Sequence, residues 1–325
     1  MSEFSFADLV SDIKATGRLG PENVLRLRRS IYGGRTVTQA QVEGLFELDR
    51  TCSEKSDAWT DLYAEAVADF LVEQQEPRGY VSDQNAAWLI DHVSRDGRVD
   101  TAAELEAVIG VLDKSRQSPE RLVRFALETA RDTILNGAAP ARRGGEYRPG
   151  VVTEADVKLL RRILYAYGGD QHIAVSRAEA EILFEVNDAT SEADNHPAWS
   201  DLFVKAVANA VLFYAGYTVP TREEALRRER WLDEPADLGA FFTRMLEGLA
   251  GILTGYGAPK APRHETEAWS DAAVQEARQV TADEARWLRD RLQRDGALHA
   301  NERALLAFLR GKAIHIDPAL SAALP

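Results

Sequence analysis

Apolar residues recur at helical spacing along nearly the whole chain, and no segment shows a convincing β-strand alternation. Two stretches follow the i, i+3, i+4, i+7 spacing of one helix face most clearly. Their apolar positions are Trp59, Leu62, Tyr63, Ala66, Val67, Phe70 and Leu71 in the first, and Trp199, Leu202, Phe203, Ala206, Val207, Ala210 and Val211 in the second. Ser56 precedes the first stretch and Pro197 the second, and both residue types favour helix N-termini. The pattern predicts an all-α protein with both tryptophans in its core.

The two stretches are also copies of each other. Residues 58–69 read AWTDLYAEAVAD, and residues 198–209 read AWSDLFVKAVAN. Upstream, the LRR and LFE segments at 27–29 and 45–47 return at 160–162 and 183–185. Such internal self-similarity indicates a duplicated structural unit. We therefore predict a tandem duplication of a helical-hairpin unit, with repeat A at about 1–140 and repeat B at about 150–260.

Helix–loop–helix patterns define the parts of each repeat. We expect hairpins over 21–49, 81–112, 152–187 and 280–311. Repeat B carries one charged helix at 222–231 where repeat A has a full hairpin, and residues 265–325 resemble the start of a third, partial unit. We expect this C-terminal hairpin to pack on repeat B, with Trp287 in the place that Trp88 occupies in repeat A. The Gly-, Ala- and Pro-containing segments 137–150 and 255–264 are the predicted boundaries.

Each repeat is expected to end with an amphipathic helix, at 119–135 and at 237–253. The second of these helices is apolar around much of its circumference. It should therefore be buried at a contact between repeats or in a dimer. Phe242→Arg should then sharply reduce solubility.

Composition limits the classes of partner. The chain has 325 residues, of which 45% are apolar and 28% charged, as in soluble globular proteins. The formal net charge of −13 repels phosphate backbones, so no nucleic-acid partner is expected.

The chain also lacks the signals of secretion or membrane insertion. One cysteine, Cys52, excludes an intrachain disulfide and is typical of a reducing compartment. The first residues are acidic rather than basic, unlike a secretion signal. The longest apolar run, 206–219, is shorter than the ~20 residues that span a bilayer. We expect a cytoplasmic protein with no membrane span.

Two Asp-Gly turns carry the pattern closest to a chemical site. Asp96-Gly97 is followed by Glu104, and Asp295-Gly296 is followed by Glu302. In an EF-hand loop a glycine makes the sharp turn and a distal Glu closes around Ca²⁺. Asp96, Glu104, Asp295 and Glu302 are therefore the candidate metal ligands.

The front half of the EF-hand pattern is absent from both turns. His92 and Ser94 in one copy, and Arg291 and Gln293 in the other, stand where carboxylates would be needed. A hard cation takes six or more oxygen ligands. Structural turns without a cofactor are the preferred interpretation, and a weak site for a divalent cation such as Ca²⁺ or Mg²⁺ is the alternative.

The segment 295–306, DGALHANERALL, resembles the TerB-like helical domain of tellurite-resistance proteins, and 96–108 is a looser match. The resemblance implies an all-helical fold and acidic residues that hold a divalent cation. Asp96, Glu104, Asp295 and Glu302 are the positions that would take that role. It also implies a stress-response function.

The sequence contains no coherent catalytic set. The six histidines are scattered without metal-ligand spacing, and the paired glycines lack the Gly-Lys-Ser/Thr ending of a phosphate-binding loop. The leading hypothesis is a non-catalytic interaction or regulatory protein that binds a partner protein or self-associates. A divalent-cation-binding stress-response protein is one alternative. An enzyme with a cleft between the repeats is another, so enzymatic activity is left open.

Overall fold

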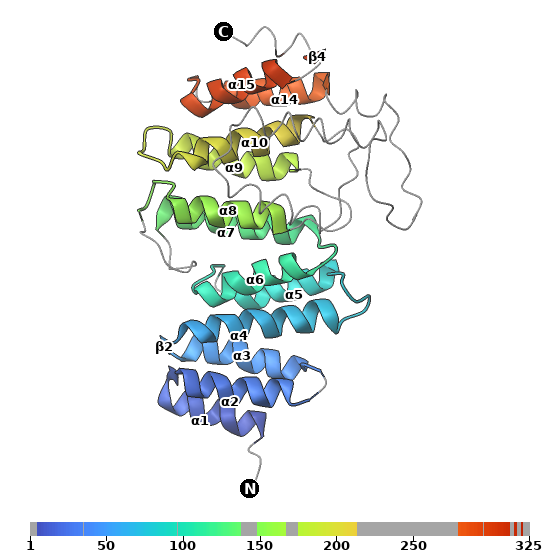
Figure 1. Ribbon diagram of the computed structural model, residues 1–325, viewed down its shortest axis with the longest axis vertical. Coiled ribbons are helices and arrows are strands. Elements are labelled where there is room, and N and C mark those ends of the chain that lie inside the picture. Colours follow the sequence, from blue (N-terminus) through green and yellow to red (C-terminus); the bar gives the residue numbers. More distant parts are fainter. Residues whose placement is uncertain are drawn as a thin grey trace, which may run out of the picture. The chain divides into compact units, whose positions relative to one another are not determined.

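The computed structural model describes residues 5–34, 36–95, 97–137, 148–166, 175–212, 279–294, 296–312, 315–316 and 320. Within these ranges the fold is all-α, with twelve α-helices, one π-helical turn and four two-residue strands (Figure 1). The chain divides into two compact units. Unit 1 comprises Met1–Gln171 with Glu192–His196, and unit 2 comprises His172–Ser191 with Pro197–Pro325.

Unit 1 contains the first eight helices. They are α1 (Phe6–Thr16), α2 (Pro21–Tyr32), α3 (Gln39–Thr51), α4 (Asp57–Ala68), α5 (Asp83–Val93), α6 (Ala102–Lys114), α7 (Glu120–Asn136) and α8 (Glu154–Ala166). The strands β1 (Arg18–Leu19) and β2 (Glu54–Lys55) flank α2 and α3, and the π-helix Asp69–Glu73 extends α4.

Unit 2 contains α9 (Arg177–Ala189), α10 (Ala198–Leu212), α14 (Ala282–Leu292) and α15 (Ala300–Lys312). The strands β3 (Gln279–Val280) and β4 (His315–Ile316) flank the last two helices. This division differs from the predicted repeat boundary at 137–150. The reason is that α8, the first helix of the predicted repeat B, packs on α6 and α7.

The central helix of unit 1 is α4, which packs against α2, α3 and α6 (Figure 1). The predicted apolar face is buried, and Trp59 and Leu62 are both 0% exposed. Full burial of a large apolar side chain stabilises a fold by roughly 1.5–3 kcal/mol. In unit 2, α10 takes the corresponding place between α9 and α15, with Trp199 1% exposed. The prediction that both tryptophans are core residues is confirmed.

Hydrogen-bonded caps begin the second helix of three of the four hairpins. Thr38 with Gln41, Thr101 with Glu104, and Ser176 with Glu179 form complete capping boxes at the starts of α3, α6 and α9. In each box the hydroxyl accepts a backbone N–H of the first turn, and the third helical residue accepts the N-cap N–H. These local sequence signals determine where the helices begin.

Short parallel pairings join the residue before a hairpin to the residue after it. β1 pairs with β2, Tyr80 pairs with Gln117, and β3 pairs with β4. Leu19 and Val152 occupy equivalent positions in the two repeated sequences, and each makes the same kind of backbone hydrogen bond. The carbonyl of Leu19 accepts the Ser56 N–H at 3.1 Å, and that of Val152 accepts the His196 N–H at 2.8 Å. Two-residue strands are too short to show an alternation in the sequence.

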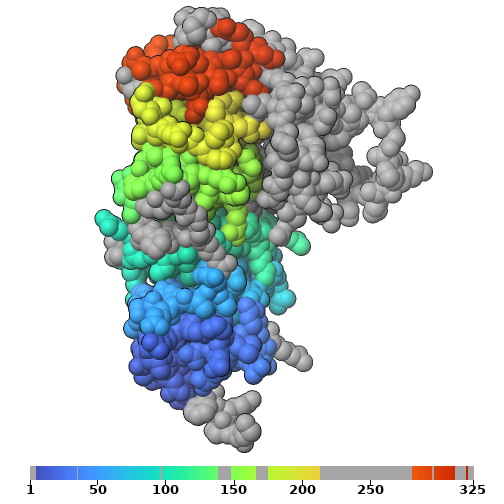
Figure 2. All heavy atoms as spheres, turned by 60° about the vertical axis from the view of Figure 1, so that its left-hand side comes forward, coloured from blue at the N-terminus to red at the C-terminus, as the bar shows by residue number. Residues whose placement is uncertain are grey.

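The C-terminal hairpin contacts the earlier helices of unit 2. In Figure 2 the red α14–α15 hairpin lies directly on the yellow α9 and α10 helices, and α15 packs against α10. Residues 213–278, with the predicted charged helix, the predicted closing helix with Phe242 and the 255–264 boundary, lie outside the described residues, as do 138–147. None of the helices in the described part of the chain has the length and apolarity needed to cross a bilayer.

Candidate functional site

Glu104 lies in the first turn of α6, where it caps the helix. Its Oε2 accepts the backbone N–H groups of Asp100 at 2.9 Å and Thr101 at 3.0 Å. The residue is 7% exposed. The pKa of this carboxyl is raised to about 7, mainly by burial and also by the nearby Asp49 carboxylate, while the two backbone hydrogen bonds oppose the shift.

Glu302 holds the same position in α15. Its Oε2 accepts the backbone N–H of His299 at 2.7 Å, and the residue is 1% exposed. Glu104 and Glu302 thus share a capping geometry and belong to different compact units.

The other two candidate ligands, Asp96 and Asp295, lie outside the described residues. The glycines that follow them have positive φ angles, 83° at Gly97 and 73° at Gly296, which glycine adopts without steric cost. Among the side chains that the structure describes, no three or more His, Cys, Asp or Glu residues are arranged to hold a metal ion. The glycines therefore make the predicted sharp turns, and the metal site stays a prediction.

A buried carboxylate that the sequence analysis did not single out joins three helices of unit 1. The Asp49 side chain, at the end of α3, is 0% exposed. Its Oδ1 accepts the Trp59 indole N–H at 2.6 Å and lies 2.9 Å from the Lys55 Nζ. Its Oδ2 accepts the Thr101 hydroxyl at 2.7 Å. This Asp49 junction connects α3 to α4 and to the capping box of α6.

One sequence signal could have identified this junction. Asp49 follows the buried Leu45 by one helical turn, so its side chain points toward the core. Burying a carboxylate is costly unless it is paired and hydrogen-bonded. An acid on an apolar helix face therefore implies nearby donors.

A second polar junction in unit 1 centres on Asp69 of the π-helix. Its Oδ2 accepts the Tyr32 hydroxyl at 2.9 Å, and its Oδ1 pairs with the Lys114 Nζ. Burial raises the pKa of Tyr32, and the bond to Asp69 adds to the rise. π-Helical turns occur often at functional positions. Here the turn connects α2 to the end of α6.

A third polar junction lies in unit 2 and centres on a buried arginine of α14. The Arg291 side chain is 2% exposed, with its Cζ 4.6 Å from the ring centre of Phe184. Its Nη2 lies 2.6 Å from Asp188 Oδ2, and its Nε lies 3.1 Å from Glu181 Oε2. Glu181 Oε1 also accepts the Trp287 indole N–H at 2.6 Å. The Arg291 junction thus connects α14 to α9.

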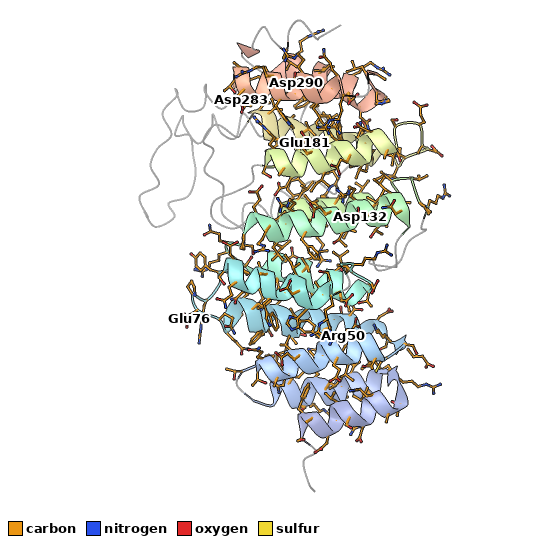
Figure 3. All side chains as sticks on the ribbon, turned by 180° about the vertical axis from the view of Figure 1, so that it is seen from behind. Arg50, Glu76, Asp132, Glu181, Asp283 and Asp290 are labelled. Carbon is orange, nitrogen blue, oxygen red and sulfur yellow. The ribbon has the colours of Figure 1, made fainter. Side chains whose placement is uncertain are left out.

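Further contacts at the edge of this junction are more exposed. Arg177 Nη2 lies 2.7 Å from Asp283 Oδ2, and the Arg177 guanidinium lies 5.3 Å from the Trp287 ring centre. Figure 3 labels Glu181 on α9 together with Asp283 and Asp290 on α14. Exposed pairs of this kind contribute little to stability compared with buried ones.

Chemically, the three junctions can hold helices at fixed positions, and Glu104 can take up a proton near neutral pH. The carboxylates of the Asp49 and Asp69 junctions are paired with donors of neighbouring elements, whereas at the Arg291 junction Arg291 Nε and Asp188 Oδ1 have no hydrogen-bond partner among the described residues. Comparison of the chain with protein-family models, with curated proteins and with solved structures found no match.

Proposed function

We propose that this chain is a non-catalytic interaction or regulatory protein whose helical hairpins bind a partner protein. One observation carries the proposal: the buried polar groups of the Asp49, Asp69 and Arg291 junctions bond to neighbouring helices. Their chemistry therefore stabilises a helical framework. Frameworks of packed helical hairpins commonly present extended surfaces to partners.

Two large apolar side chains of the described surface provide places to test binding. Leu25 is 48% exposed on α2, and Tyr80 is 37% exposed before α5. Arg26 and Arg29 are exposed on the same face of α2 as Leu25. Aromatic, apolar and arginine side chains contribute most at protein interfaces.

The experiment begins with cross-linking and co-purification of the tagged full-length chain from its own cells. Each enriched protein is then purified, and its binding is measured by calorimetry. We expect saturable binding that Leu25→Asp or Tyr80→Asp weakens by about tenfold. Asp132→Ala, an exposed change on α7, is the matched control and should leave the affinity unchanged. Failure of every purified candidate to bind would contradict the proposal.

The divalent-cation alternative is separated by titrating the full-length chain with Ca²⁺, Mg²⁺ and Mn²⁺. Binding heat that disappears in Asp96→Ala combined with Asp295→Ala would favour a cation site. Glu104→Gln combined with Glu302→Gln is an informative second variant, because Gln41 already serves as a capping residue in α3. If this variant keeps its fold but shows no binding heat with the cation, the two glutamates are ligands of the ion.

A further inference from the structure

Corresponding helices of the two units place aromatic rings in the same way. Residues 87–97 read AWLIDHVSRDG and residues 286–296 read RWLRDRLQRDG. In unit 1 the ring centres of Phe46 and Trp88 are 5.5 Å apart, and in unit 2 those of Phe184 and Trp287 are 6.2 Å apart. Trp287 in unit 2 and Trp88 in unit 1 thus each contact a phenylalanine of the helix that precedes the central helix. Each phenylalanine lies in the matching segments LFELDRT (45–51) and LFEVNDA (183–189).

In each unit, the residue one turn after the tryptophan lies beside the phenylalanine that the tryptophan contacts. This residue is a histidine in unit 1 and an arginine in unit 2. The His92 ring centre is 5.0 Å from that of Phe46, whereas the Arg291 guanidinium carbon is 4.6 Å from the Phe184 ring centre. The helix that carries the phenylalanine also differs in charge between the units. The position of the acid Asp188 in α9 is occupied by the base Arg50 in α3.

Each of the two residues has a polar partner suited to its charge. His92 Nδ1 lies 2.7 Å from the Trp88 carbonyl oxygen, a neutral backbone partner. Arg291 lies between two carboxylates, with Asp188 at 2.6 Å and Glu181 at 3.1 Å. The charges on α9 thus match α14. At the matching positions α3 keeps one carboxylate, Glu43, and carries the exposed Arg50 in place of the second.

Incorrect pairing of the hairpins would therefore be penalised in both directions. If α14 packed on α3 as it packs on α9, Arg291 would meet the positive charge of Arg50 in place of Asp188 and would keep only one carboxylate, Glu43, at the position of Glu181. If α5 packed on α9, Glu181 and Asp188 would lose their guanidinium partner. Removing one member of a buried ion pair is strongly destabilising because the other charge is left uncompensated. Similar units within one chain are prone to such misassembly.

We propose that the Arg291–Asp188 pair makes the α9 surface selective for the C-terminal hairpin, whereas His92 and Arg50 stand at the matching positions of unit 1. The α9 surface accepts a helix that carries arginine one turn after a tryptophan and rejects the α5–α6 hairpin. Specificity of this kind combines an attractive contact with repulsion of the wrong partner. This inference does not rest on the proposed function.

The test uses hydrogen exchange of the α14–α15 segment, measured by mass spectrometry on the full-length chain. Asp188→Arg places a second positive charge beside Arg291 and should accelerate exchange there at least about tenfold. Arg291→His should accelerate it as well. The double variant Asp188→Arg with Arg291→His reproduces the residues of unit 1, and its exchange should return to within about threefold of wild type. A double variant whose acceleration equals the product of the two single effects would overturn the proposal.

A converse set in unit 1 keeps the test decisive if Asp188→Arg fails to fold. His92→Arg should accelerate exchange of the α5–α6 segment, because Arg50 holds the position that Asp188 has opposite Arg291, so two positive charges would stand at matching positions. Adding Arg50→Asp should reverse that effect. Absence of reversal here would overturn the proposal on its own. In both sets, exchange of the segment in the unmutated unit is the internal control.

Discussion

The two units solve the same packing problem with different polar residues. In unit 1 the Asp49 and Asp69 carboxylates each have a lysine partner, Lys55 and Lys114 respectively. At the corresponding positions unit 2 has amides. Asn187 Oδ1 accepts an Asn301 amide N–H at 2.8 Å, and Asn209 Oδ1 accepts the Val175 backbone N–H at 2.7 Å.

The difference shows what a buried charge requires. A carboxylate removed from water needs a cation and several donors, whereas an amide needs only hydrogen-bonding partners. Unit 2 places a buried charge elsewhere, at Arg291 between two acids. The indole N–H of Trp199, unlike that of Trp59, is buried and has no hydrogen-bond partner among the residues that the structure describes. The units therefore share their apolar core pattern and differ in where charge is stabilised.

The largest effect is expected from breaking the Asp49 junction. Asp49→Ala removes the acceptor for Trp59 and Thr101 and leaves Lys55 without its partner. We expect the free energy of unfolding of unit 1 to fall by about 3 kcal/mol, measured by urea denaturation. Asp49→Asn, which imitates unit 2, should cost less. Equal losses in the two variants would contradict a role for the acceptor oxygens.

The converse change should also destabilise, by less. Asn187→Asp puts a carboxylate into a site that is 1% exposed and has no counterpart of Lys55, because the corresponding residue is Asn195. We expect a loss of about 2 kcal/mol at pH 8. The loss should shrink at pH 5, where the new acid can be protonated. A loss that does not change with pH would argue against a buried charge as its cause.

Glu104 provides a pH-dependent test of the same contrast. Its folded-state pKa is about 7, above the ordinary 4.5, so its stabilising contribution is present below pH ~4.5 and is lost as pH rises through 7. Glu104→Gln should keep the capping box and remove this loss. We expect the variant to be more stable than wild type by about 1–2 kcal/mol at pH 8, and the difference to disappear near pH 5.

Thermal unfolding between pH 5 and 8.5 measures this difference. Gln41→Glu places a carboxyl at the matching position of α3, which is half-buried, whereas Glu104 is buried. It serves as the control and should show no comparable pH dependence. A Glu104→Gln variant that is less stable than wild type at pH 8 would refute the assignment.

The smallest effect is expected at an exposed acid of the same α3 helix. Glu47 pairs with Lys14, which lowers the pKa of Glu47, and its side chain is 49% exposed. Glu47→Gln should change the free energy of unfolding by less than about 0.5 kcal/mol, since solvent screens such pairs. A loss approaching that of Asp49→Ala would show that burial does not distinguish the two acids.

The capping glutamates show why the sequence left their role open. A Glu in the first turn after an Asp-Gly turn fits both the end of an EF-hand loop and the last residue of a capping box. The Thr101-x-x-Glu104 spacing is a capping-box signature, and the structure shows that box. The spacing alone could not distinguish a metal ligand from a helix cap, because both interpretations put the carboxylate at the same place in the sequence.

The sequence by itself determined the all-α class and the burial of Trp59 and Trp199, because helical periodicity is a local pattern. Only the tertiary structure decided the partners of the buried charges. Asp49 meets Thr101 from 52 residues away, and Arg291 meets Asp188 from 103 residues away. Which donor reaches a buried acid depends on how distant helices pack, and that information is not contained in the spacing along either helix.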